Sequence, residues 1–291
     1  MIKSAIFGLA LAGSIGLGGP AAFAQDKPID TLTRSSQWLV NFDDDSCQLM
    51  AEFGPPEDRM VLKFTRYSTG DSTDIAVIGN RLKNGSTWFD VSFDFGLGKP
   101  TTRQAAGGSQ GTMPAIFVVG VRYDGLDSGA RDQGDPFPDL TPAQEAAITG
   151  VKVAVSGKKP FRLQFGPLDR PMATMRRCIT DLVQSWGYDP VVIKGLSRRL
   201  KPIVSPGSWF SSDDFPDQAM AGGHNGLLRF RLDIDEKGGV AGCHILDRTD
   251  PDDFAKVTCN RLTKNAHFKP ALDANGKVVR AFYLGSISWK A

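Results

Sequence analysis

Residues 226–246 read GLLRFRLDIDEKGGVAGCHIL, and this stretch decides the fold of the C-terminal part of the chain. In its first half, large apolar residues alternate with charged ones, which is the period of a strand with one buried face. The sequence Glu-Lys-Gly-Gly at 236–239 is typical of a turn, so residues 240–246 are expected to return as an antiparallel strand. The apolar positions of the first strand are Leu228, Phe230, Leu232 and Ile234.

The residues that follow this hairpin complete a small α+β unit. Ala255, Cys259, Leu262 and Ala266 are spaced as one face of a helix. A turn at 273–276 precedes residues 278–289, which predict a long final strand. The expected order is therefore strand, strand, helix, strand.

This order and its marker residues resemble the C-terminal domain of the TonB family, over residues 208–291. Phe215 stands where the family usually has Tyr, and His267 where it usually has Arg. The resemblance implies an antiparallel three-stranded sheet backed by a helix, without enzymatic activity. It also implies binding of an outer-membrane receptor by addition of a strand to that sheet. The marker residues are Phe215, Pro216, Gly226, Phe268 and Pro270.

The resemblance places the partner at the last strand, which would be an exposed sheet edge. Arg280, Tyr283 and Trp289 are the candidate partner-binding residues on this strand. Two alternatives stay open: the N-terminal half covers the edge, or two copies of the chain form a homodimer through it. The partner is expected to be a protein or peptide strand of the cell envelope.

The rest of the chain predicts a strand-rich domain at residues 25–188 and a linker at 189–207, which makes the whole protein α+β. A stripe of apolar residues over 172–186 predicts a single long helix that packs on the strands. Proline at 190, 202 and 206 marks the linker. Strands are expected at 38–42, 60–64, 89–95, 116–121, 151–155 and 161–165.

Composition and the first residues indicate where the protein works. The 291 residues carry a net charge of +2, which favours neither nucleic acid nor an anionic membrane as partner. Residues 1–24 are typical of a signal peptide, with a retained membrane anchor as the alternative. We expect a periplasmic or secreted protein. A cleaved signal leaves no anchor for coupling to an inner-membrane motor, although a link to TonB-dependent transmembrane transport stays open.

Four cysteines are expected to form disulfides in an exported protein. Four cysteines allow three pairings, and one bridge in each domain is the expected one. Cys243 lies where the second strand faces the helix that carries Cys259, and Cys178 lies beside the stripe of the long helix. Cys47, after the first strand, is the expected partner of Cys178.

Motifs for enzymatic chemistry are weak. Ser109 lies within Gly107-Gly108-Ser109-Gln110-Gly111, the pattern of a nucleophile elbow, but that elbow requires a strand before it and a helix after it. We expect a flexible loop there; an exported hydrolase that uses Ser109 is the alternative function. No metal site and no cofactor are predicted. Ser109 to Ala separates the two functions, because only the hydrolase would lose turnover.

Overall fold

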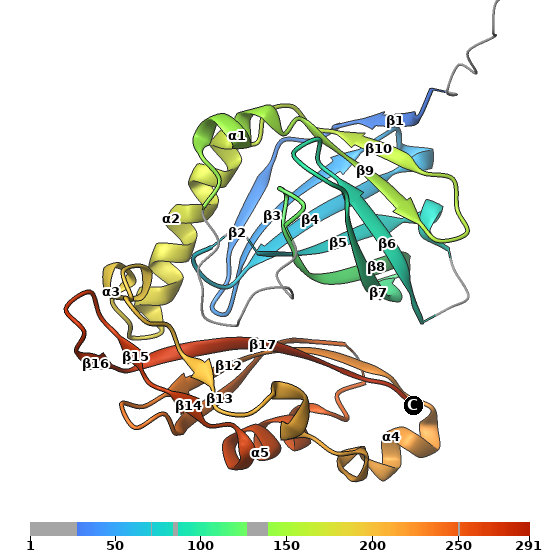
Figure 1. Ribbon diagram of the computed structural model, residues 1–291. Helices are drawn as coiled ribbons and strands as arrows, with labels where there is room; N and C mark the ends of the chain where they lie inside the picture. The colour runs from blue at the N-terminus through green and yellow to red at the C-terminus, as the bar shows by residue number, and fades with distance from the viewer. Residues whose placement is uncertain (1–27, 71, 84–86, 127–138, 250) are drawn as a thin grey trace, which may run out of the picture.

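The computed structural model describes residues 28–70, 72–83, 87–126, 139–249 and 251–291. The predicted signal peptide at residues 1–24 lies outside this part of the chain. A ten-stranded sheet forms the N-terminal part and a three-stranded sheet the C-terminal part (Figure 1). None of the helices in the described ranges has the length and apolar character needed to cross a bilayer.

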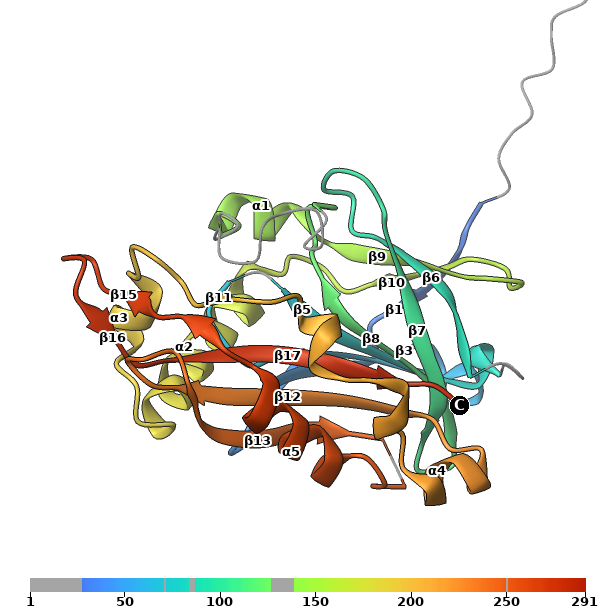
Figure 2. The same ribbon diagram turned by 60° about the horizontal axis from the view of Figure 1, so that its bottom comes forward.

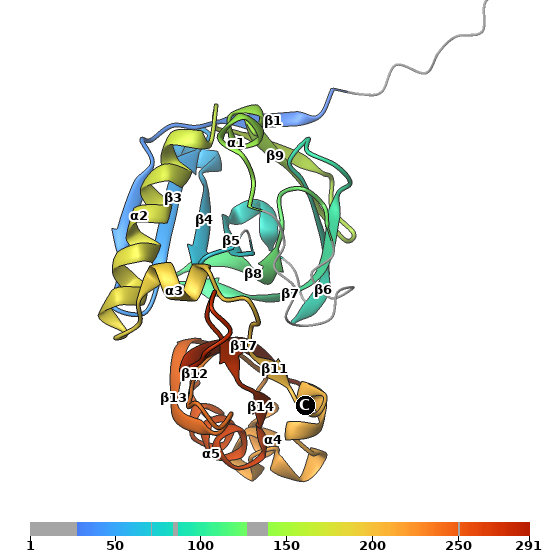
Figure 3. The same ribbon diagram turned by 60° about the vertical axis from the view of Figure 1, so that its left-hand side comes forward.

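The ten-stranded sheet curls into a barrel (Figure 3). Its strands are antiparallel except for β1, which is parallel to β10. The chain after β1 reaches β3: Arg34 bridges Phe53, and the amide of Ser35 donates to the carbonyl of Glu52 at 2.8 Å. The strands follow the order β1 (Asp30–Thr33), β10 (Phe161–Gln164), β9 (Gly150–Val155), β6 (Trp88–Asp94), β7 (Thr101–Gln110), β8 (Met113–Val121), β5 (Thr73–Gly79), β4 (Met60–Arg66), β3 (Cys47–Phe53) and β2 (Leu39–Phe42).

Two helices belong to the barrel. The short α1 (Pro142–Ala147) begins with a capping box between Thr141 and Gln144. The long α2 (Asp169–Ser185) confirms the predicted helix and packs on β2 and β3 with its apolar stripe. The Cys47–Cys178 disulfide, with 5.9 Å between the Cα atoms, joins α2 to β3.

The structure confirms the six strands predicted in this half and adds four that were not predicted, β1, β3, β5 and β7. The flexible loop expected at 107–111 is wrong. Gly107 to Gln110 belong to β7 and pair with β8, opposite residues 116 to 113. Hydrogen bonding to a neighbouring strand outweighs the low strand propensity of glycine here.

The segment expected as a linker, 189–207, has secondary structure of its own. Helix α3 (Pro190–Lys194) is capped by Asp189 and buries Ile193. Strand β11 (Lys201–Pro202) pairs with β14 (Phe268–Lys269), and η3 (Pro206–Trp209) follows it. The connection is thus packed against the C-terminal part. Shorter 3-10 turns elsewhere are η1 (Pro56–Asp58), η2 (Asn80–Leu82) and η4 (Ser212–Asp214).

The C-terminal part has the expected strand, strand, helix, strand order (Figure 2). Strand β12 (Gly226–Ile234) lies between β13 (Val240–Arg248) and β17 (Ala281–Trp289). Helix α5 (Ala255–Asn265) packs on β13, and the Cys243–Cys259 disulfide joins the two. The predicted final strand is interrupted at Arg280, because β16 (Val278–Val279) pairs with β15 (Ala271–Leu272) instead. Helix α4 (Asp217–Gly222) precedes the sheet.

Both faces of the three-stranded sheet are covered. The apolar side chains of β12 join the core with α5, whereas its charged side chains contact the barrel. The Arg229 Nε lies 3.0 Å from the Asp74 carboxylate, and the Arg231 guanidinium lies 4.2 Å from the centre of the Trp186 ring. The hydroxyl of Tyr188 donates to Asp233 at 2.9 Å. The charged residues that alternate with apolar ones along β12 therefore hold the sheet against the barrel.

Candidate functional site: a groove along the last strand

Strand β17 is an edge strand. Among the strands of the described ranges, its one neighbour is β12. Its other edge borders a groove of about 1000 Å³ that lies between the barrel and the segment 206–210. An unpaired strand edge is a template for another strand, so this edge is the candidate binding site.

The hydrogen bonds of β12 show which backbone groups of β17 face the groove. The amide and carbonyl of Leu227 both bond to Thr249, on the side of β13. Successive residues of a strand direct their N–H and C=O groups to opposite sides. Leu228 therefore directs its N–H and C=O toward β17. Leu228 lies opposite Ile287, so Ile287 bonds inward. By the same alternation, Ser286 and Ser288 present their N–H and C=O groups to the groove.

The same parity extends along the strand. Tyr283 and Gly285 lie opposite Leu232 and Phe230, which face β17, so these two residues also bond inward. Leu284 presents its N–H and C=O groups to the groove, as Ser286 does. The groove is lined by residues 283–288, so its floor is a row of alternating inward and outward backbone groups.

The two walls of the groove differ in chemistry. On the side of α5, the wall is Pro206, Gly207, Trp209 and Phe210, and the Tyr283 ring packs 5.8 Å from that of Trp209. Burial raises the pKa of Tyr283 to about 12, so its hydroxyl is protonated at neutral pH. The barrel wall is more polar and contains Ser68, Thr69, Ser72 and Arg103.

An ion pair holds the barrel wall against the sheet. The Asp74 carboxylate contacts Arg229 of β12 and accepts the amide of Gly120, at 2.9 Å, from the barrel wall. Burial raises the pKa of Asp74, although the Arg229 charge acts in the opposite direction. The Arg229 guanidinium also lies 5.3 Å from the centre of the Tyr67 ring. The shape of the groove therefore depends on contacts between the two parts of the protein.

The three residues predicted to bind the partner occupy different places. Tyr283 lines the groove. Arg280 lies outside it; its guanidinium donates to the carbonyl of Gly187 at 2.7 Å and lies over the Tyr188 ring. Trp289 is 5% exposed and belongs to the core. Its indole N–H donates to the hydroxyl of Thr258 on α5 at 3.1 Å. We therefore correct the prediction for Trp289, because its side chain packs inside the domain.

Sequence reasoning missed the residues that line most of the groove. Leu284, Ser286 and Ser288 lie on the predicted strand. The polar–apolar–polar order of residues 286–288 was a signal that the two serine side chains face away from α5, but Leu284 had no such signal. The barrel wall had no such signal. Residues 67–72 and 119–120 are far from β17 in sequence, and only the packing of the two parts brings them together.

The family markers have structural roles. The Phe215 ring packs against Phe254 and Trp289, with centroids 5.4 and 5.9 Å away. Gly226 faces the Phe254 ring, and a Cβ there would lie 2.4 Å from a ring carbon. Phe268 is buried against Trp209. Pro216 immediately precedes α4, and the carbonyl of Pro270 accepts from Arg198 at 3.0 Å.

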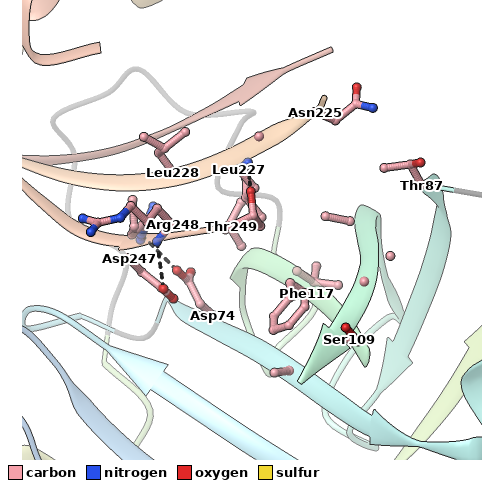
Figure 4. Close-up of a pocket in the computed structure, with 18 of the residues that line it drawn as sticks. Asp74, Thr87, Ser109, Phe117, Asn225, Leu227, Leu228, Asp247, Arg248 and Thr249 are labelled. Atoms are coloured by element: carbon pink, nitrogen blue, oxygen red, sulfur yellow. Dashed lines mark hydrogen bonds and ion pairs between the residues drawn. The ribbon is translucent and has the colours of Figure 1, made fainter. Parts of the chain in front are cut away.

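Ser109 lies in a second cavity, of about 640 Å³, between the β7–β8 hairpin and the C-terminal part (Figure 4). Residue 109 is inside β7, opposite Pro114, and the chain then turns directly into β8. The helix that a nucleophile elbow requires is absent from this hairpin. In the described ranges, no group of three or more His, Cys, Asp or Glu residues is placed to hold a metal ion.

Comparison with known proteins identifies the C-terminal part. The family model described as Gram-negative bacterial TonB protein C-terminal matches residues 212–291. No curated protein and no solved structure matches the chain. The sheet, the helix and the marker residues agree with the family match. Residues 212–291 are therefore a TonB C-terminal domain, joined to a barrel of ten strands.

Proposed function

We propose that the protein is exported to the cell envelope and captures an extended segment of an envelope protein by strand addition to β17. The observation that carries this proposal is the edge of β17 that pairs with no other strand in the described part of the chain, with the outward groups of Leu284, Ser286 and Ser288 along the groove. The TonB C-terminal domain and the two disulfides are typical of proteins outside the cytoplasm.

The energy for capture has two sources. Each backbone hydrogen bond to an added strand contributes about 0.5–1.5 kcal/mol net. A micromolar complex requires about 8 kcal/mol, so hydrogen bonds to a few outward residues do not suffice. The remainder comes from side chains that are buried between the two walls.

The test is removal of one outward N–H from the full mature chain. Ser286 to Pro removes this donor, and an edge strand tolerates proline where the N–H faces outward. Ser286 to Ala is the matched control, because it removes the hydroxyl and keeps the N–H. Envelope proteins captured by the wild type and by the alanine variant should be lost with the proline variant.

Capture is read together with amide exchange of β17. Slower exchange at Ser286 and Ser288 on addition of the captured protein locates it at the strand edge. Equal capture by the proline and alanine variants would refute strand addition. Concentration-dependent dimers that Ser286 to Pro disrupts would instead identify a second copy as the occupant of the edge.

A further inference from the structure

We infer that the strand accepted by β17 is alternately apolar and polar, and that the barrel recognises its polar side. This inference rests on the proposed strand addition and concerns the chemistry of the partner. An added strand continues the pleat of the sheet, so its successive side chains point to opposite walls of the groove. Each wall therefore selects every second residue of the partner.

The α5 side of the groove selects apolar side chains. Tyr283 and Ile287 direct their side chains to this face, as their partners on β12 do. Phe210 stands beside them and is partly exposed, so it offers apolar surface to a partner. Trp209 is buried and supports the Tyr283 ring from behind. A polar side chain placed here loses its hydration, whereas an apolar side chain buries surface.

The barrel side selects polar side chains. Ser286 and Ser288 point to this face from β17. The opposing hydroxyls of Ser68, Thr69 and Ser72 belong to the segment that joins β4 to β5. Val119 and Leu284 are the aliphatic residues of this side. A threonine, serine or charged side chain of the partner finds hydrogen-bonding groups on this wall.

The length of the recognised segment follows from the groove. Residues 283–288 line it, and a strand advances about 3.4 Å per residue, so the floor extends about 20 Å. A peptide of about seven residues covers this length. Recognition by the complete site requires the barrel and the segment 206–210 as well as the TonB C-terminal domain.

The experiment compares two fluorescein-labelled peptides of identical composition on the full mature chain. Gly-Thr-Val-Thr-Val-Thr-Gly places both valines on one face, whereas Gly-Thr-Thr-Val-Val-Thr-Gly places one valine on each face. We expect the alternating peptide to bind roughly tenfold more tightly by fluorescence anisotropy, because a second valine is buried at the apolar wall. Equal affinities, or no binding of either peptide at about 1 mM, would overturn the inference.

Two tryptophan substitutions test the barrel wall. Ser68 to Trp fills the polar side of the groove and should weaken binding of the alternating peptide by roughly tenfold or more. Ser72 to Trp is a second variant at the same wall, should the first one fail to fold. Ser156 to Trp, at the exposed turn between β9 and β10, is the matched control.

The outcomes distinguish this inference from the proposed function. Binding that survives Ser286 to Pro contradicts strand addition itself. Binding that is lost with Ser286 to Pro, but is unchanged by the tryptophan in the barrel wall and is equal for the two peptides, contradicts only the role of the barrel and the alternating pattern.

Discussion

Replacement of Arg229 by Met tests whether the barrel and the sheet form one unit. In the wild type, the Arg229 Nε lies 3.0 Å from Asp74, and the two side chains are 16% and 13% exposed. Methionine keeps the apolar stem of Arg229 and leaves the Asp74 carboxylate buried without its counterion. Loss of one partner of a buried ion pair costs about 3–5 kcal/mol.

Urea unfolding of the full mature chain measures this cost. Arg59 to Met is the matched control, because Arg59 and its partner Glu52 are 48% and 42% exposed. An exposed pair of this kind contributes about 0–1 kcal/mol. The double variant Arg229 to Met with Asp74 to Leu should recover most of the lost stability, since it removes both charges.

A free energy of unfolding for Arg229 to Met that equals that of the Arg59 control would refute this reasoning. So would a double variant that is less stable than Arg229 to Met alone. Either result would mean that the contact between the barrel and the sheet does not depend on this ion pair.

Three further predictions concern stability. Gly226 to Ala should lower the free energy of unfolding by about 1–3 kcal/mol, because its Cβ would meet the Phe254 ring at 2.4 Å; Gly108 to Ala, whose nearest contact is 3.5 Å, should change the thermal midpoint less. Removal of the Cys243–Cys259 disulfide, with a separation of 16 residues, should lower the free energy of unfolding by about 3 kcal/mol. Removal of Cys47–Cys178, with a separation of 131 residues, should lower it by about 5 kcal/mol. The reverse order of the two losses in urea unfolding would contradict the chain-entropy argument. Burial raises the pKa of Asp74, so this carboxyl binds its proton more tightly in the folded than in the unfolded state. Its contribution to the free energy of unfolding therefore falls as pH rises above about 3.8. Asp74 to Asn should remove this part of the pH dependence, and an unchanged pH profile would show that another group causes it.

The C-terminal sheet was predictable because local pattern and tertiary environment agree there. In β12 every second residue is apolar and buried against α5, so the period of two survives in the sequence. The barrel was predicted less completely. Strand β7 has the sequence TTRQAAGGSQ, which has low strand propensity and is held by its neighbours β6 and β8. A local sequence pattern does not indicate which strands, far apart in the sequence, pair with each other.

The candidate site shows the same limit. The edge strand and one of its groove-lining residues, Tyr283, were predicted, but the other residues that line the groove were not. Trp289 is a large aromatic residue at the end of a strand, and only the position of Thr258 on α5 shows that it faces the core. The outward direction of Ser286 follows from the bonds of Leu227 to Thr249, which no sequence pattern shows. The charges of Arg229 and Arg231 gave no sign that a second part of the chain covers them.

Amide hydrogen exchange along β17 tests the central claim most directly. In the free, full mature chain, the N–H groups of Leu284, Ser286 and Ser288 should exchange fast, and those of Tyr283, Gly285 and Ile287 should exchange slowly. Addition of the alternating peptide should slow the first group and leave the second unchanged. Slow exchange of Ser286 and Ser288 in the free protein, or the opposite alternation, would contradict a free strand edge in the groove.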